Sequence, residues 1–218
     1  MSEKQKISIG IMGGSFNPIH MGHLFLAEQA RVCFNLSSVI FLPTGQPAYP
    51  KNEMPVAAEH RLQMTSLAIN RHPHFFISRL EAMQKEPTYT IHSLIEFRKT
   101  YPEDRYELFF ITGADAVKDI LQWKEPERLL GMAQFIAGSR PPYSFEELYA
   151  TIADWTLAKS RIHVMQIPLL EISSCMIREY LRHGKTIKYL VPESVEQYIY
   201  KYQLYVTERR AIPGYVHS

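Results

Sequence analysis

The stretch Gly13-Gly14-Ser15-Phe16-Asn17-Pro18-Ile19-His20-Met21-Gly22-His23 joins a short apolar segment to a predicted helix. Two adjacent glycines allow a sharp backbone turn and a close approach to a ligand, and the amino end of a helix offers N–H groups to an anion. His20 and His23 are spaced i, i+3 and share one helix face, about 4.5 Å apart along the axis. The stretch predicts a site for nucleotide phosphates; the alternative is an ordinary strand-to-helix turn.

Hydrophobic periodicity predicts strands and helices that alternate along the chain. Ile7, Ile9 and Ile11 alternate with other residues in a strand that runs into the glycines, and Asn17-Pro18 is expected as the N-cap and first position of the next helix. Further strands are expected at 39–42, 75–80, 108–111, 135–137 and 162–167. Further helices are expected at 56–69, 89–97, 115–121, 126–132, 144–155 and 192–203, and one more is expected to be capped by Ser173 or Ser174 and to end at 182–184.

This alternation predicts an α/β fold, a Rossmann-like doubly wound parallel sheet with helices on both faces. Ligands of such sheets bind at the carboxyl ends of the strands, at a switch point. The sequence has no internal repeat, low-complexity tract or Gly/Ser linker. We therefore expect one domain over residues 1–218, with a C-terminal helical part from about residue 173 that carries a second phosphate-binding motif.

Composition limits the partners of the chain. The net charge of +2 argues against nucleic acid or an anionic membrane as a partner, so phosphate binding must be local. Cys33 and Cys175 are too few for a disulfide framework and lack metal-ligand spacing, so both are expected to be reduced and buried. The apolar run near the N-terminus is shorter than a signal-peptide core or membrane span, which predicts a cytoplasmic location.

A second candidate anion site lies at 172–178, where Ser173 and Ser174 precede a helix and Arg178 follows about one turn later. Its alternative is an N-cap beside a surface arginine. His60 and Arg61 are expected on a solvated helix face.

Two more segments follow strands and suit a nucleotide. Gly113 allows close approach, and Asp115 can accept from ribose hydroxyls or cap the next helix. Tyr89 and Trp123 are flat side chains that can stack on a pyridine ring or pack in the core.

The string Gly13 to His23 resembles the HxGH signature of the nucleotidyltransferase superfamily, and the chain is similar to the bacterial nicotinate-nucleotide adenylyltransferases. The segment 172–178 is similar to the family's ISSTxIR string, with Cys175 at the usual threonine position. The resemblance implies catalytic roles for His20, His23 and Arg178. It implies a second-substrate pocket formed by Lys51, Tyr89, Thr90 and Trp123. It also implies an ATP site formed by Gly13, Gly14, Ser15, Phe16, Gly113, Asp115, Ser173 and Ser174.

The implied reaction is adenylyl transfer from ATP to nicotinate mononucleotide, which gives deamido-NAD and pyrophosphate. The resemblance implies Mg²⁺ bound through the ATP phosphates and no metal held by the protein. Alternatives within the enzyme class are acceptors such as nicotinamide mononucleotide, phosphopantetheine or a sugar-alcohol phosphate. An ATP-sensing protein on the same fold is the alternative outside that class, because 47–51 departs from the family pattern. The sequence leaves homo-oligomerisation open.

Overall fold

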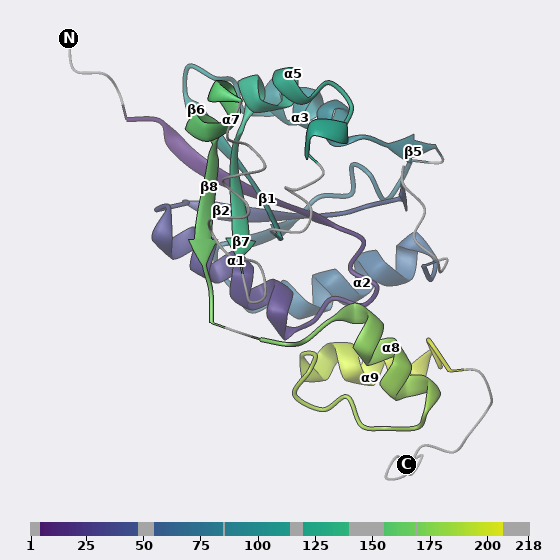
Figure 1. Cartoon of the computed structure of the whole chain (residues 1–218). Helices are drawn as coiled ribbons and strands as arrows, with labels where there is room; N and C mark the ends of the chain where they lie inside the picture. The colour runs from purple at the N-terminus through teal and green to yellow at the C-terminus, as the bar shows by residue number, and fades with distance from the viewer. Residues whose placement is uncertain are drawn as a thin grey trace.

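We describe the fold from a computed structural model over residues 5–47, 55–84, 86–113, 120–139, 155–168 and 170–206. Six parallel strands form one sheet in the order β4-β2-β1-β6-β7-β8 (Figure 1). Along the chain these are β1 (Ile7–Gly14), β2 (Ser38–Pro43), β4 (Phe75–Ile77), β6 (Tyr106–Gly113), β7 (Gln134–Ser139) and β8 (Ile162–Gln166). The strand order reverses between β1 and β6, which is the switch point of a doubly wound sheet.

Helices cover both faces of this sheet (Figure 1). One face is covered by α1 (Met21–Cys33) and α2 (Ala58–Ile69), and the other by α3 (Thr90–Thr100), α5 (Pro126–Met132) and α7 (Thr156–Arg161). Ile9 and Ile11 of β1 belong to the core on the α3 side, whereas Met12 belongs to the core on the α1 side. The alternation of the strands therefore fills two separate cores, and the predicted doubly wound fold is confirmed.

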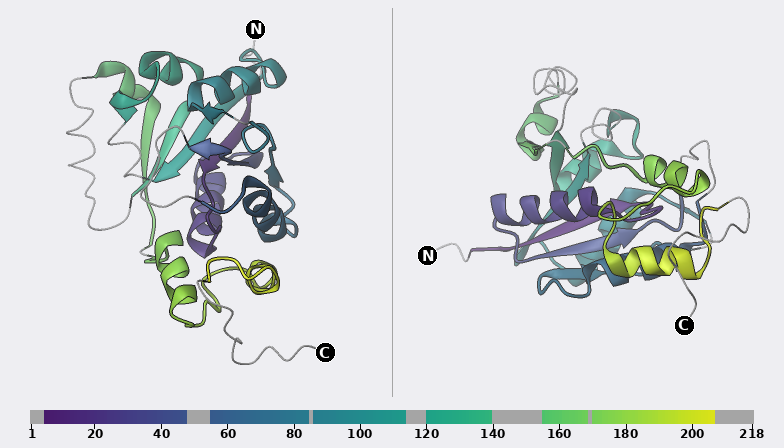
Figure 2. Two further views of the ribbon diagram at one scale, coloured as in Figure 1. Left: turned by 90° about the vertical axis from the view of Figure 1, so that its right-hand side faces the viewer. Right: turned by 90° about the horizontal axis from the view of Figure 1, so that it is seen from below.

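The last two helices lie beyond the carboxyl edge of the sheet (Figures 1 and 2). They are α8 (Ser174–Arg182) and α9 (Glu193–Lys201). Their buried residues join the core on the α1 side, and Ser194 of α9 donates a hydrogen bond to Leu67 O of α2 at 3.1 Å. This packing brings the end of the described chain next to its first turn.

Three short elements connect the longer ones. β3 (Gln46–Pro47) pairs in parallel with β5 (Pro87–Thr88), and a short 3₁₀ turn, η1 (Ile120–Gln122), precedes α5. The sequence did not predict β3, β5 or α7, because a two-residue strand and a helix of less than two turns carry little periodicity. The expected helix at 144–155 lies outside the described residues except for its last position, and so does most of the one at 115–121.

The start of the first helix was predicted wrongly. Helix α1 begins at Met21 with His20 as its N-cap, not at Pro18 with Asn17 as the cap. The side chain of Asn17 instead accepts hydrogen bonds from Val56 N at 3.3 Å and from the Tyr205 hydroxyl at 2.9 Å. Contacts with distant segments thus hold this segment outside the helix and override its local capping signal.

Cys33 and Cys175 are both exposed, so the expectation that they are buried was wrong. Each cysteine lies near the end of an amphipathic helix, on its outer face. Across the described ranges, the helices are too short or too polar to span a bilayer.

Candidate functional site

The two glycines that end β1 lie beside the end of β6, at the switch point. A Cβ atom at Gly13 would lie 2.6 Å from Cζ of Phe110, a distance at which atoms overlap. Only glycine therefore lets β1 and the ring of Phe110 pack this closely. Gly113 is the last residue of β6 and belongs to the same strand edge.

The two histidines meet at the start of α1. Their rings are stacked, with centroids 3.7 Å apart and planes at 26°. His23 Nδ1 accepts a hydrogen bond from the backbone N–H of His20 at 3.2 Å. A ring nitrogen that accepts carries no proton, so the N–H of the His23 ring is on Nε2. His20 is only 6% exposed, whereas His23 is partly exposed.

Neighbouring residues fix this pair in place. Phe16 adopts a positive φ of 45°, is buried, and packs its ring edge-on against His23 with centroids 5.1 Å apart. A Cβ atom at Gly22 would lie 3.1 Å from His20 Nδ1, so glycine leaves room for the His20 ring. Phe16 therefore supports His23 with its buried side chain.

The second motif lies directly against the first. Ser173 is the N-cap of α8 and accepts a hydrogen bond from Met176 N at 3.2 Å. The Ser174 hydroxyl donates to Pro18 O at 2.8 Å, and Arg178 Nη1 donates to Asn17 O at 2.8 Å. Burial raises the pKa of Tyr205, which keeps the hydroxyl that holds the Asn17 side chain protonated. The structure thus brings together the two motifs that the sequence places far apart.

Three of the residues predicted for the second substrate, Tyr89, Thr90 and Trp123, lie around the start of α3. Tyr89 is the N-cap of α3, and Thr90 is its first residue. Lys124, which follows Trp123, places its Nζ atom 4.7 Å from the centroid of the Tyr89 ring. Trp123 is partly exposed and packs edge-on against Phe110, with ring centroids 6.2 Å apart. The segments of Tyr89 and Trp123 are therefore neighbours, and the Trp123 side chain also packs against the core on the α3 side.

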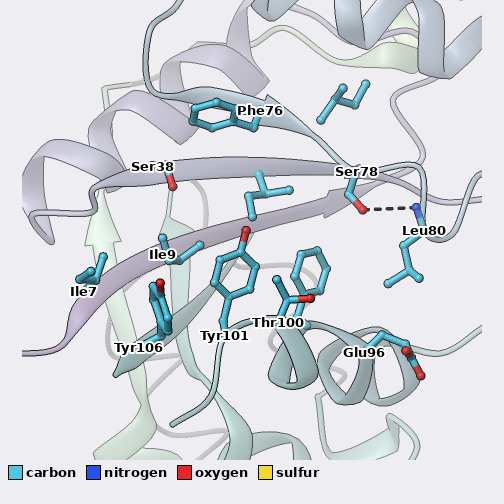
Figure 3. Close-up of a pocket in the computed structure, with 13 residues that line it drawn as sticks. Ile7, Ile9, Ser38, Phe76, Ser78, Leu80, Glu96, Thr100, Tyr101 and Tyr106 are labelled. Atoms are coloured by element: carbon cyan, nitrogen blue, oxygen red, sulfur yellow. Dashed lines mark hydrogen bonds between the residues drawn. The ribbon is translucent and has the colours of Figure 1, made fainter. Parts of the chain in front are cut away.

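Two predicted site residues lie outside the described part of the chain, namely Asp115 and Lys51. Within the described ranges, no three His, Cys, Asp or Glu side chains gather as metal ligands would. A groove of about 710 Å³ lies elsewhere, between β4 and the carboxyl half of α3 (Figure 3). None of the predicted site residues lines this groove.

Sequence reasoning missed Arg61. It was expected on a solvated helix face, but its side chain is 1% exposed. The guanidinium donates four hydrogen bonds to backbone carbonyl oxygens, including that of Ser15. A charged side chain in the first turn of a helix gives no sequence signal for such burial, because its partners are backbone atoms of other segments.

Comparison with known proteins agrees with this geometry. A family model described as cytidylyltransferase-like matches residues 11–180. A relative from Moorella thermoacetica named "Probable nicotinate-nucleotide adenylyltransferase" is 44% identical over 90% of this chain and 91% of its own length. A relative of the same name from Thermus thermophilus is 44% identical over 90% of this chain and 98% of its own length.

Solved structures give the same result. The chain is similar to the nicotinic acid mononucleotide adenylyltransferase of Plasmodium falciparum, which was solved in complex with APC and in complex with NaAD. The TM-scores are 0.71 and 0.72 at 25% sequence identity, and each comparison covers 91% of this chain and 97% of the other.

Proposed function

Because the chain belongs to the nicotinate-nucleotide adenylyltransferases, within the cytidylyltransferase-like family, we propose that it transfers the adenylyl group of ATP to nicotinate mononucleotide. The products are deamido-NAD and pyrophosphate, and the reaction is a step of NAD biosynthesis. The Plasmodium falciparum relative, solved with NaAD, supports a pyridine nucleotide as the product.

The chemistry requires alignment and charge neutralisation more than proton transfer. A phosphate oxygen of the mononucleotide attacks the α-phosphorus of ATP, and the bond from that phosphorus to the bridging oxygen of pyrophosphate breaks. The attacking phosphate is already ionised near neutral pH, so no general base is needed. The protein must align two anions that repel each other and stabilise the negative charge that grows on the leaving pyrophosphate.

One observation carries this proposal: the start of α8 is bonded directly to the segment that precedes α1. The bonds from Ser174 to Pro18 O and from Arg178 to Asn17 O bring a guanidinium and two helix amino ends to one place beside the switch point. Helix amino ends and a planar cation favour phosphate oxygens. His23 adds an Nε2–H donor, because its Nδ1 atom is occupied by the backbone of His20.

The individual contacts remain proposals. We assign catalytic contacts to His20, His23 and Arg178. The ATP contacts are assigned to Gly13, Gly14, Ser15, Phe16, Gly113, Asp115, Ser173 and Ser174. Contacts with the mononucleotide are assigned to Lys51, Tyr89, Thr90 and Trp123. Mg²⁺ enters as part of the substrate, as the magnesium complex of ATP. The cytoplasmic location, the single domain and the question of self-association stay predictions from the sequence.

The test is a product assay on the purified protein with ATP and Mg²⁺. Nicotinate mononucleotide, nicotinamide mononucleotide and phosphopantetheine are supplied in parallel, and dinucleotide and pyrophosphate are quantified by chromatography. We expect deamido-NAD and pyrophosphate in equal amounts, with the acid preferred over the amide. Preference for the amide would refute the substrate assignment and spare the reaction type. Tight ATP binding without product would identify an ATP-sensing protein.

A further inference from the structure

We propose that Arg61 is a positioning residue that fixes the ATP turn and the second-substrate pocket in one relative geometry. The inference rests on the proposed function, because it concerns the alignment of the two substrates. Arg61 lies on α2, and it is fully buried. Its hydrogen bonds go to backbone carbonyl oxygens, and it acts through the backbone that it holds.

The guanidinium spans two segments that belong to different substrates. Arg61 Nη1 donates to Ser15 O at 2.7 Å, in the turn assigned to ATP. The same nitrogen donates to Thr44 O at 2.5 Å, and Nη2 donates to Gly45 O at 2.7 Å. Nε donates to Val56 O at 2.9 Å, just before α2. One rigid, planar group thus reinforces the backbone bond from Thr44 N to Gly14 O, at 2.9 Å, that joins the ATP turn to the end of β2.

The Thr44–Gly45 segment connects Arg61 to the residues assigned to the mononucleotide. It leads directly into β3, whose Gln46 and Pro47 pair with Pro87 and Thr88 of β5. β5 is followed at once by Tyr89 and Thr90, the residues assigned to the mononucleotide. A Cβ atom at Gly45 would lie 2.2 Å from the backbone oxygen of Glu81, so this segment is also packed tightly on its other side. A shift of the Thr44 and Gly45 carbonyls would therefore displace the β3–β5 pair, which leads into Tyr89 and Thr90.

The chemistry of the side chain explains why an arginine occupies this position. Among the described residues, no carboxylate lies within ion-pair distance of Arg61, and burial lowers the pKa of its guanidinium. Burying a cation is costly unless its hydrogen bonds are satisfied, and here backbone carbonyls satisfy them. Only a planar fork with several fixed N–H directions can serve carbonyls from three segments at once. A lysine ammonium presents three donors from one point and cannot span them.

Arg98 provides a matched control at the other edge of the sheet. It lies in the carboxyl half of α3 and also binds only backbone carbonyls among the described residues, those of Met132, Tyr101 and Tyr106. Burial lowers the pKa of Arg98 as well. Substitutions at Arg61 and Arg98 therefore remove similar sets of bonds, but only Arg61 reaches the substrate segments.

The experiment compares Arg61→Lys and Arg61→Ala with Arg98→Lys and Arg98→Ala in the full chain. We measure kcat, the KM of each substrate and the unfolding temperature. Arg61→Lys is expected to lower kcat by about 10- to 100-fold, because a misplacement of about 1 Å can cost that much. The KM of the mononucleotide is expected to rise together with this loss. Arg98→Lys should lower the unfolding temperature by a similar amount and leave kcat near the wild-type value.

Addition of guanidinium ion at millimolar concentration gives a readout that a purely structural role would not move. Turnover by Arg61→Ala is expected to rise with guanidinium, because the ion can enter the vacated space and bind the same carbonyls, whereas turnover by Arg98→Ala should not. Equal kcat losses at Arg61 and Arg98, or unfolding of both Arg61 variants, would overturn the assignment.

Failure of the proposed function would look different, since the wild type would then form no dinucleotide. In that case, calorimetry with a non-hydrolysable ATP analogue still reports on Ser15. Weaker binding by Arg61→Lys than by Arg98→Lys would support Arg61 as a positioning residue, and equal affinities would overturn it.

Discussion

His23 combines two roles on its two ring nitrogens, and side-chain geometry allows them to be separated. Nδ1 accepts the backbone N–H of His20 at the start of α1, and Nε2 carries the proton that we assign to the phosphates of ATP. Asparagine can place an oxygen close to the Nδ1 position, but it has no atom at the Nε2 position. His23→Asn therefore keeps the helix-start bond and loses the donor, whereas His23→Ala loses both.

The expected magnitudes follow from these contacts. Loss of a helix-start hydrogen bond costs about 1 kcal/mol of stability, which lowers the unfolding temperature of a chain of this size by about 2–4 °C. Loss of a donor to charge that grows in the transition state costs about 10²- to 10³-fold in kcat. We thus expect His23→Asn to unfold near the wild-type temperature and to lose kcat as severely as His23→Ala.

Steady-state kinetics, calorimetry with an ATP analogue and thermal unfolding decide this prediction. ATP affinity should change much less than kcat in both variants, because the contact strengthens in the transition state. Turnover by His23→Asn within a few-fold of the wild type would refute the role of Nε2. Equal losses in kcat and in ATP affinity would assign His23 to ground-state binding instead.

Three further changes test other contacts. Ser174→Ala removes the donor to Pro18 O and should lower the free energy of unfolding by about 1 kcal/mol, measured by urea denaturation. An unchanged free energy of unfolding would show that this bond does not stabilise the fold. Gly13→Ala places a Cβ atom against Phe110 and should lower the free energy of unfolding by about 1–3 kcal/mol. Adding Phe110→Leu to the same chain should recover part of this loss, whereas additive losses of the two substitutions would contradict the overlap. Burial raises the pKa of Glu81 in the folded state, so stability should fall as pH rises above its unfolded value of about 4.3. Urea midpoints at low and neutral pH should show this fall in the wild type and a smaller one in Glu81→Gln; identical pH profiles would count against it.

The sheet could be predicted from the sequence because its signals are local. The continuous apolar run Leu108 to Ile111 predicts a strand covered on both faces, and its residues alternate between the two cores. The glycines at the end of β1 and the serines before α8 likewise predict turns and caps from their own chemistry. The carboxyl ends of parallel strands share one edge, so the order of strands and motifs along the chain is enough to place these segments together.

The site departs from prediction wherever a polar group finds a partner far away in the sequence. Asn17 has the sequence signature of a helix cap, yet its side-chain oxygen binds Tyr205, which is 188 positions away. Arg61 has the signature of a solvated helix face, yet it binds carbonyl oxygens of three segments. Local propensity amounts to a few tenths of a kcal/mol up to about 1 kcal/mol per residue, whereas an unsatisfied buried polar group costs about 1–3 kcal/mol. The larger cost decides the conformation, and backbone carbonyls as partners carry no side-chain signature that a sequence could show. At this edge of the sheet, the residues that set the geometry of the site are therefore the ones that sequence patterns describe least well.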